Sequence, residues 1–259
     1  MPVKLFAKTS GAGKPVILIH GLFGAGDNLG VVARALASDY CVHLLDLRNH
    51  GASPHTDVMD YPSMAADVLA YMDDNGLDKS VLLGHSMGGK VAMQLALDAP
   101  ERVTGLIVAD IAPVEYPAWH TDVFKGMFAV AEHEIHQRKE ADQILAGHVA
   151  ESGVRQFLLR NLVRTPEERY VWRVNLTGIH GSYQNIRLAP TGDMPYEGPV
   201  LFVKGECSDY IDSAHQKQVL LLFPASQLKV IGGAGHWLHA EKPELFNRIV
   251  SRFLSGLNS

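Results

Sequence analysis

The stretch Ser80-Val-Leu-Leu-Gly-His-Ser86-Met-Gly-Gly89 carries an apolar run directly into the pattern Gly84-x-Ser86-x-Gly88, and a helical pattern follows it. A serine on a tight turn between a strand and a helix needs glycine two positions before and after it, because side chains there would collide with neighbouring backbone. The helix would also turn its unpaired N–H groups toward an oxyanion formed at the serine. The pattern therefore predicts a nucleophile elbow, with Ser86 placed for acyl chemistry.

Composition limits what the chain can be. Its 259 residues are 47% hydrophobic, with a mean hydropathy of +0.02, which is enough to bury the core of one α/β domain with an insertion. A net charge of -5 and a pI near 6.2 give no electrostatic case for a nucleic acid or an anionic membrane as partner. We therefore expect a small-molecule substrate, and nothing in the sequence points to a metal or to an obligate protein partner.

The sequence offers no membrane or secretion signal. No apolar stretch approaches the roughly 20 residues of a membrane span, and the N-terminal segment Met1-Pro-Val-Lys-Leu-Phe6 lacks the apolar centre of a signal peptide. The two cysteines, Cys41 and Cys207, have no metal-like spacing, and we expect no disulfide between them. A cytoplasmic location is the expectation.

Strand and helix patterns alternate over most of the chain. Apolar, β-branched runs that predict buried parallel strands occupy 16–19, 41–45, 81–83, 105–109, 199–203 and 227–231. Helical patterns occupy 28–37, 60–75, 87–98, 213–223 and 243–254. This alternation predicts an α/β fold with a doubly wound, mostly parallel sheet.

One interval breaks the alternation. Between 113 and 198 the sequence carries helical patterns and no convincing strand. The helices are expected near 120–135, 138–150, 153–163 and 167–176. Because about 85 residues is far longer than a typical connection, we predict an inserted helical cap over 113–198. The core would then be formed by 1–112 and 199–259, and the cap would cover the carboxyl ends of the strands, where α/β sheets bind ligands.

A serine nucleophile needs a base, and the base needs a third group to orient it. His236 follows the last predicted strand in Gly232-Gly-Ala-Gly-His236-Trp237, whose small residues leave room for the imidazole to reach back over the sheet. It also comes after Ser86, as the hydrolase order of serine, acid and histidine requires. We therefore predict that His236 is the base.

Two aspartates end strands where the acid could lie. Asp110 closes the run at 105–109, and a buried carboxylate there would need a strong partner such as His236. Asp209 lies in the loop after the next strand, where many α/β-hydrolases carry their acid, although it could equally cap a turn or helix. Spacing alone does not separate the two.

An oxyanion hole needs two N–H donors. One normally comes from the residue after the nucleophile, here Met87. The loop His20-Gly-Leu-Phe-Gly24 follows a predicted strand near the elbow, and we place the second donor at Leu22, with Phe23 as the next choice. His20 is expected to brace this loop rather than to act in catalysis.

Five sequence blocks together carry a family likeness. They are His-Gly-Leu-Phe-Gly (20–24), Asp-Leu-Arg-Asn-His-Gly (46–51), Gly-His-Ser-Met-Gly-Gly-Lys (84–90), Asp-Ile-Ala-Pro (110–113) and Gly-Ala-Gly-His-Trp-Leu-His-Ala-Glu-Lys-Pro (233–243). With them the chain resembles the YbfF-type esterases of the α/β-hydrolase superfamily. The resemblance implies a serine esterase or thioesterase with a small helical cap, acting on modest acyl esters without a cofactor. It also favours Asp110 over Asp209, because the family matches this chain at Asp-Ile-Ala-Pro.

The expected reaction is hydrolysis of carboxylic esters or thioesters with short to medium acyl groups, through an acyl-enzyme on Ser86. Serine-type carbon–carbon bond hydrolysis and cofactor-free haloperoxidase chemistry are alternatives on the same fold, and a non-catalytic binding protein is a third. Seven arginines in 113–198 could dock an anionic carrier such as coenzyme A, but they do not share one helical face and a solvated surface also accounts for them. Arg48, in the phrase Asp46-Leu-Arg48, is expected to tie loops together.

Overall fold

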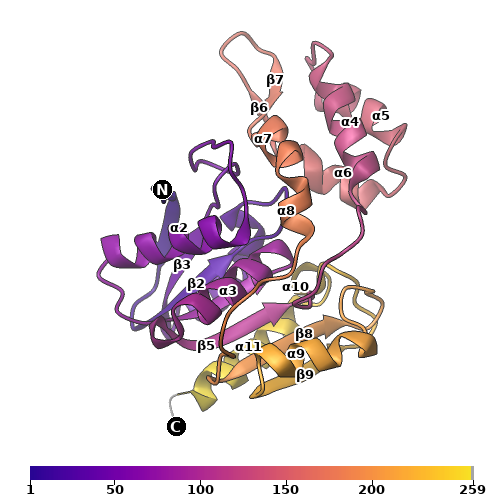
Figure 1. The fold of residues 1–259 in the computed structure, drawn as a ribbon. Helices are drawn as coiled ribbons and strands as arrows, with labels where there is room; N and C mark the ends of the chain where they lie inside the picture. The colour runs from indigo at the N-terminus through magenta and orange to yellow at the C-terminus, as the bar shows by residue number, and fades with distance from the viewer. Residues whose placement is uncertain (258–259) are drawn as a thin grey trace.

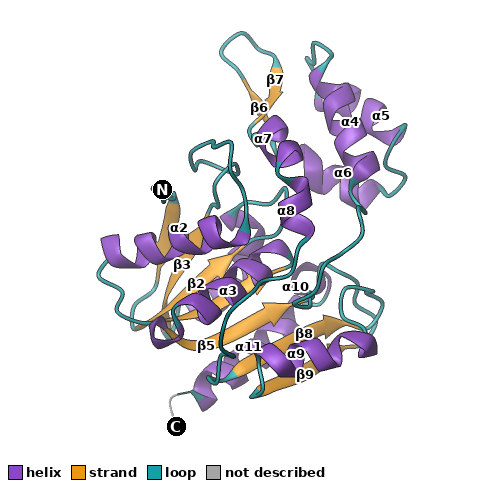
Figure 2. Ribbon diagram, viewed as in Figure 1, coloured by secondary structure: helices purple, strands orange, loops and turns teal. Residues whose placement is uncertain are grey.

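The computed structural model describes residues 1–257, in which one sheet of seven strands lies between two layers of helices (Figures 1 and 2). The strands run in the order β1-β3-β2-β4-β5-β8-β9. Their bounds are β1 (Ala7–Ser10), β2 (Lys14–Ile19), β3 (Tyr40–Leu45), β4 (Ser80–His85), β5 (Val103–Ala109), β8 (Val200–Gly205) and β9 (Ser226–Ile231). All neighbours pair in parallel except β1, which pairs with β3 in the antiparallel sense.

The six predicted parallel strands are all present, and β1 is the one that the sequence did not reveal. Its four residues, Ala-Lys-Thr-Ser, are mostly exposed and include no apolar run. It is an edge strand that pairs with β3 through backbone hydrogen bonds, so no hydrophobic pattern was required of it.

The core helices pack on the two faces of the sheet according to the alternation of its side chains. Their bounds are α1 (Gly30–Leu36), α2 (Tyr61–Asp74), α3 (Met87–Asp98), α9 (Gln216–Leu222), α10 (Leu238–Glu241) and α11 (Pro243–Gly256), with short 3-10 turns η1 (Gly26–Leu29), η2 (Pro100–Arg102) and η3 (Ser213–His215). Along β2, Ile17 is buried in one cluster with α2 and α3, whereas Leu18 is buried in the other with α1 and α11. Both faces of the sheet are therefore covered, as expected for parallel strands.

The insertion between β5 and β8 forms a separate group of elements on one side of the core (Figure 1). It contains α4 (Thr121–Ala131), α5 (Arg138–Ala146), α6 (Ser152–Leu159), β6 (Leu162–Arg164), β7 (Tyr170–Trp172), α7 (Leu176–Gly181) and α8 (Tyr183–Arg187). We call this group the cap.

The cap differs from the prediction, which gave no helix for α8 or for most of α7 and no strand for β6 and β7. The expected helix over 167–176 is wrong, because β6 and β7 form an antiparallel hairpin there. Tyr170-Val-Trp172 consists of aromatic and β-branched residues, which favour a strand over a helix. Glu168 adopts a φ of 64° in the turn, where the Thr165 N–H donates to the Arg169 carbonyl at 2.7 Å. The helical spacing in this segment was incidental.

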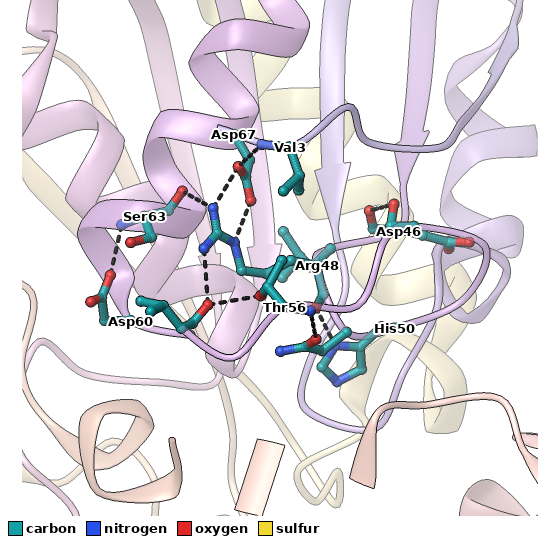
Figure 3. A network of polar contacts seen from close by, with 12 residues as sticks. Val3, Asp46, Arg48, His50, Thr56, Asp60, Ser63 and Asp67 are labelled. Atoms are coloured by element: carbon teal, nitrogen blue, oxygen red, sulfur yellow. Dashed lines mark hydrogen bonds and ion pairs between the residues drawn. The ribbon is translucent and has the colours of Figure 1, made fainter. Parts of the chain in front are cut away.

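Arg48 ties together the loops that follow β3 (Figure 3). Its guanidinium donates to both carboxylate oxygens of Asp67 on α2, at 2.6 and 2.7 Å, and both side chains are buried. It also donates to the carbonyls of Val58 and Ser63 at 2.9 and 3.1 Å. The structural role expected for Arg48 is confirmed.

Within the described residues, no helix combines the length and the apolar character that crossing a membrane requires. Cys41, which is partly buried, and Cys207, which is exposed, are both free thiols.

Candidate active site

Ser86 lies on the turn between β4 and α3 with φ 54° and ψ −122°, a conformation that few residues other than glycine adopt. Its N–H donates to the Ala109 carbonyl at 2.9 Å, which fixes the turn against β5. The glycines on either side are required by space: a Cβ on Gly84 would lie 2.1 Å from the Gly88 carbonyl oxygen, and one on Gly88 would lie 2.3 Å from that of Ile19. The segment has the geometry of a nucleophile elbow.

His236, in the loop after β9, contacts Asp110 at the end of β5. The distance from its Nδ1 to Asp110 Oδ2 is 2.7 Å, and because a carboxylate only accepts, Nδ1 carries the hydrogen. The other ring nitrogen, Nε2, then has a free lone pair. His236 lines the same cavity as Ser86, so the structure places a serine, an imidazole and a carboxylate in one region.

Asp110 is completely buried and sits at a φ of 54°. Three donors surround its carboxylate: the Gly205 N–H at 2.9 Å, the Ser208 hydroxyl, and His236 Nδ1. These donors satisfy a charge that would otherwise be costly to bury. Asp110 is therefore held rigidly against the imidazole.

Asp209 occupies a different place. It is exposed and lines a cavity beside α9 and β9. The residue before it, Ser208, donates a hydrogen bond from its hydroxyl to the Asp110 carboxylate. This loop therefore contacts Asp110 through Ser208 and not through Asp209. Of the two candidate acids, the structure brings only Asp110 into contact with His236 within the described residues.

The loop after β2 lies beside Ser86, because a Cβ on Gly21 would be 3.2 Å from the Ser86 Cβ. Leu22 and Met87 line a small cavity with Ser86. Met87 is the first residue of α3, so its N–H is among the helix N-terminal groups that have no intrahelical partner. The Phe23 N–H, the alternative donor, is bound to His50 Nε2 at 3.0 Å. This hydrogen bond leaves Leu22 as the better placed donor.

Two buried histidines hold this loop. His20 Nε2 accepts from the Leu47 N–H at 3.0 Å, so its Nδ1 carries the hydrogen and donates to the Gly21 carbonyl at 2.8 Å. Burial lowers the pKa of His20 to about 4 and that of His50 to about 3, because both rings lie away from water. Both are neutral braces, as expected for His20.

Two residues contact the base that the sequence did not single out for this role. The Tyr210 ring stacks on the His236 ring, with centroids 4.0 Å apart and planes inclined by 21°. His85 Nε2 donates to the His236 carbonyl at 2.8 Å. Tyr210 is next to Asp209 and His85 is next to Ser86, but only the folded arrangement of the loops shows that they meet His236.

A family profile for the alpha/beta hydrolase fold matches residues 14–243. The chain belongs to this family. It is 40% identical to Esterase YbfF of Escherichia coli K12, over 93% of each chain. It is also 40% identical to the sn-1-specific diacylglycerol lipase ABHD11 of Xenopus laevis, over 94% of this chain and 80% of the relative.

A solved structure titled "Marine microorganism esterase" superposes on this hydrolase with a TM-score of 0.91. The two are 39% identical, and the match covers 97% of this chain and 99% of the other. These comparisons confirm the predicted fold class and the resemblance to the YbfF-type esterases, and they identify the chain as a hydrolase enzyme.

Proposed function

We propose that this hydrolase cleaves carboxylic esters through an acyl-enzyme on Ser86. The observation that carries the proposal is the contact between His236 Nδ1 and the buried Asp110 carboxylate, beside a serine held in the elbow conformation. His236 serves as general base and Asp110 orients it. The esterase and lipase names of the relatives agree with this reaction.

The reaction has two halves. His236 Nε2 takes the Ser86 hydroxyl proton while Oγ attacks the ester carbonyl carbon. The oxyanion that forms accepts hydrogen bonds from the N–H groups of Leu22 and Met87. The carbon–oxygen bond to the alcohol then breaks as His236 returns the proton to the alcohol oxygen. A water molecule, deprotonated by the same imidazole, attacks the acyl-enzyme and releases the carboxylic acid and Ser86. No step requires a cofactor.

Replacing the nucleophile tests this proposal directly. Ser86→Ala should abolish hydrolysis of p-nitrophenyl butyrate while thermal unfolding stays cooperative, because the change only replaces the serine hydroxyl by hydrogen. A fluorophosphonate probe should add its mass at Ser86 of the wild-type enzyme and not label the variant. Undiminished turnover by Ser86→Ala would overturn the assignment, and a wild-type protein that is neither labelled nor active would point to a binding protein.

Thioesters such as acyl-CoA are an extension of the same chemistry. The guanidinium groups of five of the seven cap arginines already have partners within the cap or its connections, which are backbone carbonyls for Arg138 and carboxylates for Arg155, Arg164, Arg169 and Arg187. Arg160 is exposed and lines the cavity that contains Ser86. If a coenzyme A phosphate binds there, Arg160→Ala should raise the KM for acetyl-CoA several-fold and weaken its dependence on salt, and leave the KM for p-nitrophenyl acetate unchanged. Equal KM values for both enzymes would exclude docking at Arg160.

The cytoplasmic location expected from the sequence stays a prediction, and so does the absence of an obligate protein partner. Fractionation of cells that express the tagged protein would test the first, and the mass of the purified native protein would test the second.

A further inference from the structure

Two cavities of very different size meet at Ser86. One, of about 450 Å³, lies between the cap and the core, and the other measures only about 40 Å³. Both are lined by Ser86 and Leu22, so both open on the reacting centre. They also share Trp119, His120 and Tyr210. They differ in that His236 lines only the larger cavity, whereas Met87 and Lys90 line only the smaller one.

The reaction determines which half of the ester lies in which cavity. In the reaction proposed above, on which this argument rests, His236 must deliver its proton to the alcohol oxygen. The alcohol therefore leaves on the side that His236 lines. The acyl chain, on the other side of the carbonyl carbon, extends past Met87.

We propose that the 40 Å³ cavity is the acyl pocket and the 450 Å³ cavity is the alcohol pocket, so that the enzyme selects esters of short acids with bulky apolar alcohols. A water-sized group needs roughly 10–15 Å³ of such space. The smaller cavity therefore holds about three carbon-sized groups, which corresponds to acyl chains of up to about four carbons. The larger cavity has a volume typical of small-molecule sites.

The walls of the acyl pocket are held in place by their own hydrogen bonds. Lys90, one helical turn after Ser86, is buried and donates to the carbonyls of Arg187 and Leu188 at 3.0 and 2.6 Å. The Tyr61 hydroxyl donates to the Ile186 carbonyl at 2.6 Å. Opening the pocket would leave these buried groups without partners, at about 1–3 kcal/mol each.

Lys90 also lies against aromatic rings, 4.6 Å from the centroid of Tyr116 and 5.4 Å from that of Tyr61. The Tyr116 hydroxyl accepts from the Ala112 N–H at 2.8 Å and donates to the Tyr210 carbonyl. Every polar side chain named on this wall therefore has hydrogen-bond partners within the protein. The pocket therefore cannot lengthen past Lys90, Tyr61 and Tyr116 by a simple side-chain rotation.

The alcohol pocket is lined in part by apolar side chains that are only partly buried. Val154 and Phe157, which are only partly buried, line it from α6, and Trp237 and Ala240 line it from the loop after β9 and from α10. Phe157 and Trp237 pack together with centroids 5.7 Å apart. A hexyl chain or a ring can lie along these apolar side chains.

Isomeric esters test the direction without changing size or hydrophobicity. Hexyl acetate and ethyl hexanoate have the same formula, and acid release from each can be followed by titration at constant pH. We expect kcat/KM for hexyl acetate to exceed that for ethyl hexanoate by about tenfold or more, since even one methylene too many costs about tenfold in a tight pocket. Equal values, or a preference for ethyl hexanoate, would overturn the assignment of the two cavities.

A pair of matched variants locates the effect. Ile186→Ala removes side-chain volume from the acyl pocket and keeps the backbone carbonyl that Tyr61 binds. It should raise the ratio of kcat/KM for ethyl hexanoate to that for ethyl acetate by about tenfold. Val154→Ala enlarges the other cavity, so it should leave that ratio unchanged and alter only the preference between hexyl acetate and ethyl acetate.

The failure of this inference and the failure of the proposed function are distinguishable. If neither ester is cleaved and the fluorophosphonate probe does not label Ser86, the proposed function is wrong. If both esters are cleaved and Ser86 is labelled, but Val154→Ala shifts the acyl ratio and Ile186→Ala does not, the pockets are exchanged. The wild-type comparison of the two isomers stands even if Ile186→Ala is unstable.

Discussion

Replacing Asp110 by asparagine isolates the role of the buried carboxylate, because the two side chains have the same shape. In the native protein Oδ1 accepts from the Gly205 N–H, whereas Oδ2 accepts from Ser208 and from His236 Nδ1. An amide has one oxygen that accepts and one nitrogen that donates. It can therefore satisfy Gly205 or His236 in the native way, but not both.

The structure decides which of the two orientations the amide takes. With its oxygen toward His236, the amide nitrogen would face the Gly205 N–H, and a buried donor would be left against another donor at about 1–3 kcal/mol. With its oxygen toward Gly205, the amide nitrogen donates to His236 Nδ1, and the imidazole hydrogen moves to Nε2. The second orientation is preferred, and an imidazole protonated on Nε2 cannot take the Ser86 proton.

The expected loss is large. The wrong tautomer, together with the loss of a negative charge beside the developing imidazolium, should lower kcat by about 10⁴-fold, which corresponds to about 5.5 kcal/mol in the activation free energy. KM should change little, because Asp110 is buried beneath His236 and has no surface toward substrate. Thermal unfolding should stay cooperative.

The assay is hydrolysis of p-nitrophenyl acetate by the wild type, Asp110→Asn and Asp209→Asn. Asp209→Asn is the matched control, because Asp209 is exposed and, within the described residues, the carboxylate that binds His236 is that of Asp110. Its kcat should stay within about twofold of the wild type. The reasoning fails if Asp110→Asn keeps more than a tenth of the activity, or if Asp209→Asn is the variant that loses it.

Three further predictions concern the scaffold. Arg48→Met should lower the free energy of unfolding in urea by about 3–5 kcal/mol, because it leaves the buried Asp67 carboxylate without its partner. The double variant Arg48→Met with Asp67→Leu should recover more than half of that loss, and no recovery would contradict a stabilising role for the ion pair. Gly88→Ala, whose Cβ would lie 2.3 Å from a backbone oxygen, should destabilise the protein by about 3 kcal/mol or more, whereas Gly153→Ala, with open space around it, should not. Burial lowers the pKa of His50 to about 3, below its ordinary value of 6.5, so the unfolded chain binds the extra proton and stability falls as the pH drops below 6.5. Relative to His50→Gln, the wild type should lose about 1.4 kcal/mol per pH unit between pH 6.5 and 4.5, and parallel urea-unfolding curves for the two proteins would contradict this.

The elbow could be predicted from sequence because its causes are local. Gly84, Ser86 and Gly88 meet constraints set within five residues and by the two neighbouring strands, β2 and β5. For the two glycines the constraint is a Cβ position blocked by backbone. Parallel strands were equally visible because they are buried on both faces and read as apolar runs. In contrast, β1 is short and mostly exposed, and β6 and β7 have three residues each, of which only Leu162 is fully buried. No continuous burial pattern therefore marked them.

The acid is a harder case, because two aspartates end neighbouring strands at the same edge of the sheet. What separates them is the backbone at Asp110, whose φ of 54° accompanies a carboxylate directed at Gly205 and His236. Asp110 and His236 are 126 residues apart, and no spacing rule encodes that turn. The resemblance to the YbfF-type esterases supplied the preference that the residues alone could not.

Asn49 and His50 form hydrogen bonds that join the loop after β2 to the cap. His50 holds the Phe23 N–H, and Asn49 Oδ1 accepts from the Asn175 side chain of the cap at 3.0 Å. From the cap, Asn161 donates to the Phe23 carbonyl at 2.6 Å. The loop that carries the proposed oxyanion donor is thus fixed by the core on one side and by the cap on the other. Because the cap also forms part of the walls of both cavities, contacts between the cap and the core fix both the oxyanion donor and the size of the two proposed pockets.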